Sequence, residues 1–443
     1  MTHASWDVVI IGAGAAGLSA ARALAEAGRS VLLLEARDRL GGRIWTRHEV
    51  GAGAAVELGA EFIHGQIPQT LDLLHETGEV ALDTQGAHWT FLQGQLQERT
   101  DDLFEQIQTA MRAADLTGKA DISFQAFLDQ ARHHGVSQDA IALARRFVQG
   151  FDAADPVRVS AQSIAEEWAS GGMLDAPQFR PSGGYSSVVR ALAGRLGRNN
   201  VHIQLQTVVK SIRWQEGAVD IEGSFIGRPF SVRAPKAVIT VPVGVLQLPH
   251  SAPAAIHFSP SLQEKRTALA GILSGSVLKV VLRFRTPFWE ELDGGRYHDA
   301  SFFHSLETSF PTFWTSLPVR SPFLNAWIGG PPAELLSERS DAEIVEAALT
   351  SLERMFGDRL PAGQAQLESA HLHNWQRDPF SCGAYSYVAV GNNNTARREL
   401  AAPLKDTLFF AGEATDTEGE TATVAGALQS GARAAREVIG SGS

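Results

Sequence analysis

Short apolar runs near the N-terminus flank a stretch that is rich in alanine and leucine. Residues 7–11 and 30–34 consist mainly of Val, Ile and Leu, which is typical of buried parallel strands. Residues 18–27 lie between them and end before Gly28, as a helix commonly does. The pattern predicts a strand–helix–strand unit of the length that a parallel βαβ motif needs.

The pattern changes further along the chain. Between about residues 71 and 195, apolar residues recur three and four positions apart, which predicts helices, for example over 122–135 and 140–151. Strand patterns follow at residues 201–214, 218–223, 237–242 and 276–284, a helical pattern at 342–356, and a strand and a helix at 408–413 and 424–439.

Apolar strands followed by alanine-rich helices therefore occur at both ends of a chain of 443 residues, which is about three times the size of an ordinary domain. We predict a mixed α/β fold with two discontinuous domains. A Rossmann-like domain would comprise residues 1–75, 196–270 and 380–443. A substrate-binding domain, with a mixed sheet and helices, would comprise residues 76–195 and 271–379.

Charge and composition exclude several classes of protein. The chain has 38 Lys and Arg against 49 Asp and Glu, a net charge of −11, which argues against nucleic-acid and anionic-membrane partners. Its one cysteine, Cys382, excludes an intrachain disulfide. No uninterrupted apolar run reaches the roughly 18 residues of a membrane span, and the first residues do not resemble a targeting signal. We expect a cytoplasmic protein.

A glycine motif follows the first predicted strand. Gly12 would permit a tight turn, Gly14 would let a pyrophosphate approach the backbone, and Gly17 would let helix and strand pack closely. The N–H groups at the start of the helix favour phosphates. Glu35 ends the second strand, where a carboxylate can bind ribose hydroxyls. This spacing does not choose between NAD and FAD.

A second glycine pair precedes Arg43. Gly41 and Gly42 could present N–H groups to another phosphate, with the Arg43 guanidinium beside them. The alternative interpretation is a surface turn with a solvated arginine.

Five segments resemble the flavin-containing amine oxidase family, and they occur in that family's order. They are residues 7–24, 32–46, 57–65, 375–387 and 408–435. The resemblance is closer to polyamine oxidases than to monoamine oxidases. It implies that FAD accepts electrons from an amine C–N bond, that the imine is hydrolysed to an aldehyde and an amine, and that O2 becomes H2O2. The implied partners are a small amine and O2.

The resemblance also implies which residues bind FAD. The set consists of Gly12, Gly14, Ala16, Gly17, Glu35, Ala36, Arg37, Gly42, Arg43, Gly59, Ala60, Glu61, Val209, Trp375, Gly412, Glu413, Thr423, Val424 and Ala427. Monoamine oxidases carry a flavin-linked cysteine where this chain has Ala384, and Cys382 does not match that position. We therefore expect FAD to be bound non-covalently.

Four residues are candidates for catalysis. Lys279 interrupts an apolar strand, which on sequence alone is typical of an edge strand. The resemblance instead implies that Lys279 holds a water at flavin N5. It also implies that Trp375 packs near the flavin, that Tyr385 forms a wall of the substrate site, and that His64 lies near the substrate nitrogen.

The substrate site is expected to include His64, Tyr385, Thr423, Phe303 and Trp314. Thr423 stands where monoamine oxidases have a second aromatic wall, so the resemblance favours a polyamine or a secondary amine.

Several alternatives remain open at this stage. The acidic residues Asp416, Glu418 and Glu420 would either attract a distal ammonium group or form a solvated loop. The enzyme could be a monoamine or L-amino-acid oxidase, or a flavin amine dehydrogenase that uses another acceptor. An NAD(P)-dependent dehydrogenase and a flavoprotein scaffold without turnover are the other classes. The histidines form no coherent ligand set, so we expect no metal.

Overall fold

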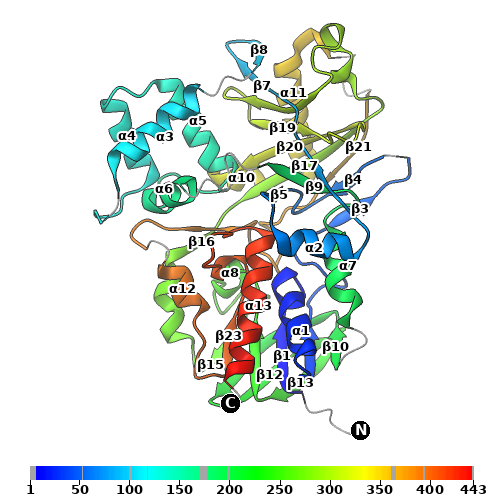
Figure 1. The fold of residues 1–443 in the computed structure, drawn as a ribbon, viewed down its shortest axis with the longest axis vertical. Helices are drawn as coiled ribbons and strands as arrows, with labels where there is room; N and C mark the ends of the chain where they lie inside the picture. The colour runs from blue at the N-terminus through cyan, green and yellow to red at the C-terminus, as the bar shows by residue number, and fades with distance from the viewer. Residues whose placement is uncertain are drawn as a thin grey trace.

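A computed structural model describes residues 6–51, 53–98, 102–116, 118–169, 177–196, 200–360, 366–392 and 395–441. The fold is mixed α/β, as predicted. The helix near the start of the chain and the one near its end stand side by side in the lower part of Figure 1, whereas strands from the middle of the chain form much of the upper part.

A parallel sheet of five strands forms the centre of the lower part. Its order is β10 (Val201–Gln204), β2 (Val31–Leu34), β1 (Val8–Ile11), β14 (Lys236–Ile239) and β23 (Leu408–Phe410). Every residue of β1 and β2 is buried. Burial of both faces explains why these strands are continuously apolar rather than alternating.

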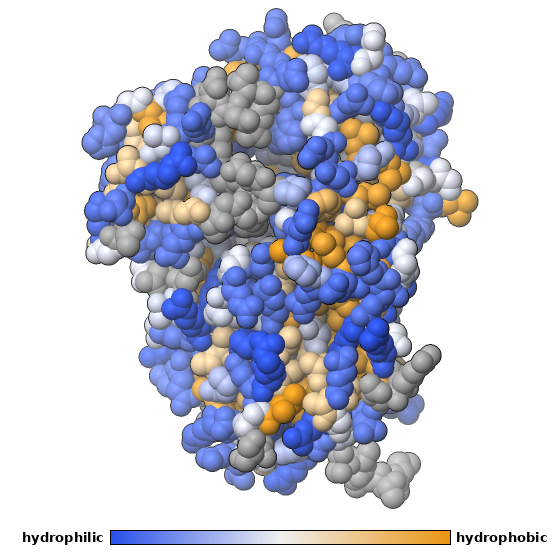
Figure 2. All heavy atoms as spheres, in the orientation of Figure 1, coloured by the Kyte–Doolittle hydropathy of each residue, from blue (hydrophilic) through white to orange (hydrophobic). Residues whose placement is uncertain are grey.

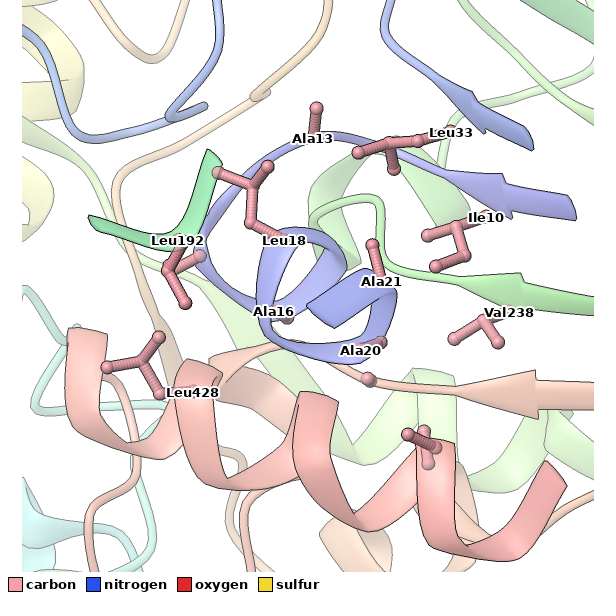
Figure 3. Packing of buried hydrophobic residues seen from close by; sticks show 14 of the residues in the cluster. Ile10, Ala13, Ala16, Leu18, Ala20, Ala21, Leu33, Leu192, Val238 and Leu428 are labelled. Carbon is pink, nitrogen blue, oxygen red and sulfur yellow. The ribbon is translucent and has the colours of Figure 1, made fainter. Parts of the chain in front are cut away.

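Two helices from opposite ends of the chain cover one face of this sheet. These are α1 (Ala15–Glu26) and α13 (Val424–Gly440). In Figure 3, side chains from three neighbouring strands are directed toward α1, and Leu428 of α13 belongs to the same buried cluster. The Ser19 hydroxyl donates a hydrogen bond to the Leu428 carbonyl at 2.8 Å, so a side-chain hydrogen bond as well as packing joins the two helices near their N-termini.

The opposite face of the parallel sheet packs on a smaller sheet of four strands. Its members are β11 (Thr207–Gln215), β12 (Ala218–Phe225), β13 (Arg228–Ala234) and β15 (His257–Ser259).

A sheet of seven strands forms the upper right part of Figure 1. In sheet order, its strands are β21 (Leu367–Leu372), β17 (Val277–Phe284), β20 (Phe323–Gly329), β19 (Thr312–Thr315), β18 (Ala300–Ser305), β7 (Ala87–Leu92) and β8 (Gln95–Glu98). Helix α11 (Asp341–Phe356) packs on one face and begins with a capping box between Ser340 and Glu343.

Helices cluster at the upper left of Figure 1, in the region where the apolar pattern predicts them. They are α3 (Asp102–Ala114), α4 (Phe124–His133), α5 (Gln138–Gly150) and α6 (Ala161–Ala169). The hydroxyls of Ser123 and Ser137 cap α4 and α5.

Shorter elements connect these parts. They are β3 (Thr46–His48), β4 (Ala55–Glu57), β5 (Ile63–His64), α2 (Pro68–Glu76), β6 (Ala81–Asp83), β9 (Gln178–Pro181), α7 (Ser186–Gly194), α8 (Val243–Leu246), α9 (Arg266–Gly271), β16 (Ile272–Ser274), α10 (Gly330–Ser337), β22 (Ser386–Val388) and α12 (Thr395–Ala401). Two of the small sheets, β16 with β22 and β5 with β9 and β6, join segments that the sequence assigns to different domains. The domain boundaries stay a prediction.

The surface is mainly polar on the face shown in Figure 2, where hydrophobic side chains occupy smaller areas between hydrophilic ones. Among the described residues, none of the helices combines the length and the apolar character that crossing a bilayer demands.

Candidate active site

One cavity of about 1560 Å³ brings the candidate residues together. It is lined by the loops at the ends of β1 and β2, by the seven-stranded sheet, and by α5 and α6. Every residue that the sequence analysis assigned to FAD, catalysis or substrate lines this cavity, with the exceptions of Gly17 and Phe303.

The glycine loop has the shape that a pyrophosphate requires. Gly12 has a φ of +105°, a left-handed backbone value, and a Cβ there would lie 2.7 Å from the Thr240 hydroxyl. A Cβ on Gly17 would lie 1.9 Å from the Gly12 carbonyl oxygen. Gly17 therefore has the packing role that its spacing predicts, but it lies behind the loop and does not face the cavity.

The loop containing Gly42 lies against the one containing Gly14. A Cβ on Gly42 would be 3.2 Å from the Gly14 Cα, and both residues line the cavity. Gly14 is also the N-cap of α1 and has no side chain with which to cap it. The first N–H groups of α1 are thus available to a phosphate.

Glu35 is held in place by backbone donors. Its two carboxylate oxygens accept hydrogen bonds from the N–H groups of Ala13 at 2.8 Å and Arg37 at 2.9 Å. Arg37 in turn donates to Asp378 at 2.6 Å. Glu35 is buried and lines the cavity, so its remaining acceptor capacity is available to a hydroxyl-bearing ligand in that cavity. Together with the glycine loops, it forms a cradle that fits FAD.

Arg43 connects the cradle to the substrate end. Its Nη1 atom lies 3.0 Å from a Glu413 carboxylate oxygen and donates to the Ala384 carbonyl at 2.5 Å. Glu413 also accepts from the Ser386 hydroxyl at 2.6 Å. The Arg43 guanidinium is therefore not a solvated surface charge, which excludes that alternative for its turn.

The N-terminus of α13 also faces the cavity. The Thr423 hydroxyl accepts from the Gly426 N–H at 3.1 Å and so caps the helix. Thr423, Val424 and Ala427 all line the cavity. A helix N-terminus carries partial positive charge, which suits a group that gains electrons beside it.

Lys279 lies on an interior strand of the seven-stranded sheet rather than on an edge strand. Its strand, β17, is placed between β21 and β20, and Lys279 is 4% exposed. The edge-strand interpretation is therefore wrong. The Lys279 Nζ atom lies 2.5 Å from a Glu61 carboxylate oxygen and 3.3 Å from the Gly59 carbonyl oxygen.

Glu61 is surrounded by cationic and polar donors. Besides Lys279, it lies 2.8 Å from the Arg180 Nε atom and accepts from the Trp314 indole at 2.9 Å. Burial alone would raise the pKa of Glu61, but Lys279 and Arg180 outweigh it and lower that pKa. The Glu61 carboxylate is thus paired with Lys279 and Arg180. Its contact with FAD stays a prediction, and such a contact would have to coexist with these two ion pairs.

Glu57 is a second buried acid in this region. Burial raises its pKa to about 7, although Lys279 and the backbone N–H of Tyr185 act in the opposite direction. Its carboxylate accepts hydrogen bonds from that Tyr185 N–H at 2.6 Å and from the Thr46 hydroxyl at 2.8 Å.

Aromatic side chains form the walls next to Lys279. The Trp375 indole donates to the Leu58 carbonyl at 2.8 Å, and the Tyr385 hydroxyl donates to the Phe151 carbonyl at 2.6 Å. The His64 ring meets the Phe151 ring edge-on at 5.5 Å. Burial lowers the pKa of His64 to about 4, so this imidazole is neutral at pH 7.

Phe303 is the candidate that the structure corrects. It is fully buried in the core beneath α11, in contact with Phe356. Successive residues of a strand point to opposite faces, and Phe302 lines the cavity. The centroid of its ring lies 6.0 Å from that of Phe62 and 6.1 Å from that of Trp314. Phe303 therefore does not line the cavity, which corrects its predicted place in the substrate site.

Cys382 and the acidic loop also have definite positions. The Cys382 thiol is hydrogen-bonded to the Pro379 carbonyl at 3.5 Å and is not part of the cavity lining, whereas Ala384 is. Asp416 is buried and accepts from the N–H groups of Glu418 and Glu420 at 3.2 and 2.9 Å. Asp416 thus orders its own loop, and it is neither solvated nor part of the cavity lining.

Two features of the site were missed by the sequence analysis: the ion pair of Arg180 with Glu61, and the pair of Asp152 and Glu167 in the cavity lining. Arg180 belongs to none of the motifs found in the sequence. Its partner Glu61 lies on a distant segment, so the sequence gives no signal that the two residues pair. Within the described ranges, no cluster of His, Cys, Asp and Glu is arranged to hold a metal ion.

Comparison with known proteins agrees with this geometry. A family model described as flavin containing amine oxidoreductase matches residues 15–439. Polyamine oxidase 2 from Arabidopsis thaliana is 29% identical, over 99% of this chain and 89% of the plant protein. Lysine-specific histone demethylase 2 from Homo sapiens is 26% identical over 98% of this chain, which spans about half (53%) of the demethylase.

Solved structures show the same fold. A structure of putrescine oxidase superposes with a TM-score of 0.80 at 22% identity and covers 98% of this chain and 99% of its own. The family model covers nearly the whole chain. The chain belongs to the flavin-containing amine oxidoreductase family.

Proposed function

We propose that this protein oxidises an amine with non-covalently bound FAD, and that its substrate is a polyamine or a secondary amine. The observation that carries the proposal is the single cavity in which the dinucleotide cradle continues into an aromatic-walled pocket with a buried lysine. The imine product would be hydrolysed to an aldehyde and an amine, and O2 would be reduced to H2O2.

FAD, when bound, supplies the two-electron acceptor for the hydrogen leaving the α-carbon of the amine. The chain's own residues orient the reactants. Trp375 and Tyr385 are fixed by hydrogen bonds to backbone carbonyls, so their rings form rigid walls. Such walls restrict the orientations that a bound amine can adopt.

Lys279 places an ammonium group in an apolar wall of the cavity. Its contacts with Glu61 and the Gly59 carbonyl fix the position of Nζ, which can hold a water molecule through its one remaining N–H donor. That water is available for hydrolysis of the imine, and the ammonium charge is available to stabilise negative charge that develops when O2 is reduced.

His64 is positioned to interact with the substrate nitrogen. Because it is neutral, it does not repel a cationic amine, and its Nδ1 atom has no hydrogen-bond partner among the described residues. A neutral imidazole nitrogen can accept a hydrogen bond from an amine N–H. Reaction requires the neutral amine, and a neutral acceptor is compatible with that protonation state.

Two features support a polyamine or secondary amine. Thr423 is a small residue at the flavin end of the pocket, which leaves room for a substituent on the nitrogen. Arg180 is already paired with Glu61 and with the carbonyls of Thr315 and Leu317, so it is not available to bind the carboxylate of an amino acid.

The test is peroxide release by the purified yellow protein with spermine, spermidine, N-acetylated polyamines, putrescine, phenethylamine, tyramine and L-amino acids. We expect the largest signal from polyamines. Peroxide only from arylalkylamines or amino acids would overturn the substrate class. If no peroxide appears, flavin bleaching under anaerobic conditions indicates a dehydrogenase, and its absence contradicts amine oxidation altogether.

A further inference from the structure

One largely buried arginine approaches the catalytic end from outside the cavity. Arg180 lies in β9, the central strand of the small sheet with β5 and β6, and it does not belong to the cavity lining. Its side chain is only 12% exposed. Burial lowers the pKa of Arg180, but Glu61 and Glu57 act in the opposite direction, and a guanidinium keeps its charge in proteins. Arg180 is therefore a fixed positive charge beside the site.

The guanidinium of Arg180 has a defined position. Its Nη1 and Nη2 atoms donate hydrogen bonds to the carbonyls of Leu317 and Thr315 at 2.7 and 2.9 Å. Its Cζ atom lies 4.7 Å from the centroid of the Phe62 ring, in a cation–π contact. Its third nitrogen, Nε, lies 2.8 Å from Oε1 of Glu61. Backbone and aromatic contacts therefore fix the guanidinium with Nε next to the Glu61 carboxylate.

The two carboxylate oxygens of Glu61 meet different cations. Oε1 contacts Arg180 and accepts from the Trp314 indole at 2.9 Å, whereas Oε2 lies 2.5 Å from the Lys279 Nζ atom. A carboxylate is planar and rigid, so fixing Oε1 restricts the direction in which Oε2 points. The contacts of Arg180 and Trp314 thus orient the oxygen that meets Lys279.

Arg180 also affects the charge of Glu61. Burial is the largest influence on the pKa of Glu61 and raises it, but Lys279, Arg180 and the Trp314 indole together lower that pKa. Glu57 is the other acid near these cations, and its pKa of about 7 leaves it largely protonated in mildly acidic solution. Without Arg180, burial would be opposed by Lys279 and Trp314 alone, which favours the protonated carboxyl. A protonated Glu61 forms no ion pair with Lys279.

We propose that Arg180 is a positioning residue for the reaction: it keeps the Glu61 carboxylate ionised and oriented, and through that carboxylate it holds the Lys279 ammonium group at the catalytic end. This inference rests on the proposed function. It assigns a role to a side chain that lies outside the cavity lining and acts only through Glu61.

The first test is the pH dependence of stability in four purified, flavin-loaded proteins: the wild type, Glu61→Gln, Arg180→Gln and the double variant. Urea unfolding between pH 5 and 8 gives the effect of Glu61→Gln with and without Arg180. With Arg180 present, Glu61 is ionised throughout this range, so we expect its effect to be constant.

With Arg180→Gln, folding favours the protonated Glu61 carboxyl. Its contribution to stability is then largest at pH 5 and is lost as pH rises. We expect the unfolding equilibrium constant of Arg180→Gln, relative to that of the double variant, to rise about 10-fold or more between pH 5 and 8. This change corresponds to moving the midpoint of titration by about one pH unit.

The second test is the pH profile of flavin reoxidation. The flavin is reduced anaerobically with dithionite and mixed with O2 in a stopped-flow instrument. We expect Arg180→Gln to show an additional inflection between pH 5 and 8, because Lys279 is held only where Glu61 is ionised. Adding Glu61→Gln should remove that inflection, because the titrating group is gone. A merely structural role of Arg180 would lower stability without creating an inflection that depends on Glu61.

Arg190→Gln is the matched control, because Arg190 forms an ion pair with Glu79 at 3.1 Å on the exposed side of α7. It should leave both profiles unchanged. The proposal is overturned if either profile of Arg180→Gln follows the wild type, if the inflection persists in the double variant, or if Arg190→Gln reproduces the changes.

A second variant applies if Arg180→Gln does not fold or does not retain flavin. Arg180→Lys keeps a charge but lacks the fork that reaches Glu61 and two carbonyls together. We expect the same changes with a smaller amplitude, and profiles identical to the wild type would overturn the proposal.

Failure of the proposed function gives a different pattern. Neither measurement uses an amine, so both can be made on a flavin-loaded protein that oxidises none of the tested amines. In that case, a pH-dependent effect of Glu61 that appears only in Arg180→Gln supports the positioning role, and its absence overturns it.

Discussion

The two ends of the cavity are built in different ways. At the nucleotide end, two glycine loops line the cavity, and the packing that shapes the first of them is partly local, as between Gly17 and the Gly12 carbonyl oxygen. At the substrate end, Lys279, Glu61 and Arg180 come from three distant segments and acquire their state from one another. Backbone recognition is therefore local in sequence, whereas side-chain chemistry depends on the assembled fold.

The largest expected effect comes from a substitution that disrupts the nucleotide end of the cavity. In Gly17→Val, the added Cβ would meet the Gly12 carbonyl oxygen at 1.9 Å. We expect loss of flavin from the purified protein and destabilisation by more than about 3 kcal/mol, because backbone must shift. Absorbance near 450 nm and thermal unfolding measure these effects.

Gly194→Ala is the control for that substitution, because a Cβ at Gly194 meets nothing within 4 Å. It should retain flavin and change stability by less than about 1 kcal/mol. A flavin-loaded Gly17→Val protein would show that the nucleotide end tolerates rearrangement.

The two neighbouring phenylalanines of β18 separate packing from substrate contact. Phe303→Ala removes a ring from the core and should destabilise the protein by about 3 kcal/mol or more, with little change in KM. Phe302→Ala should raise KM with a smaller loss of stability, because its ring lines the cavity. Urea unfolding and steady-state kinetics on both variants distinguish these outcomes, and the reverse pattern would contradict the assignment of faces.

Lys279→Met tests the substrate end of the cavity, where the side chains come from distant segments. The substitution removes the ammonium group and leaves Glu61 with Arg180 as its remaining cationic partner. We expect reoxidation of the reduced flavin by O2 to slow about 100-fold, as when a preorganised electrostatic group is removed. Stopped-flow absorbance measures the rate, and Lys210→Met, at an exposed position of β11, is the control. Unchanged reoxidation and unchanged imine hydrolysis would remove the role proposed for Lys279.

The smallest expected effect concerns Glu57 and pH. The pKa of Glu57 is about 7 in the folded protein against 4.5 for an ordinary glutamate, so folding favours the protonated carboxyl. That contribution is complete below pH 4.5 and is lost as pH rises through 7. Relative to Glu57→Gln, the wild type should lose about 2 kcal/mol of stability between pH 5 and 8. Urea unfolding at several pH values measures this difference. If the stability of the wild type and of Glu57→Gln changed with pH in the same way, the account would be contradicted.

Much of the fold could be predicted, because local signals determine it. The apolar runs and the glycine spacing predict β1, α1 and β2 to within a few residues. The helical periodicity likewise predicts α4, α5 and α11.

The faces and pairings at the substrate end could not be predicted in the same way. Residues Phe302 and Phe303 are identical and adjacent, so alternation along the strand does not tell which of them faces the cavity. Glu61 and Arg180 are more than 100 positions apart and belong to no shared motif. Lys279 is buried on an interior strand that β20 and β21 flank, and its own apolar neighbours do not reveal that position.

The order of strands in the parallel sheet has a consequence for synthesis on the ribosome. Strand β1 pairs with β14, and the Thr240 hydroxyl that follows β14 binds the Ile11 carbonyl 229 residues earlier in the chain. At roughly 5 to 20 residues per second, that partner is translated about 10 to 50 s after β1. During this interval one edge of an apolar strand has no native neighbour, so the nascent chain is a natural client for chaperones that cover exposed hydrophobic segments.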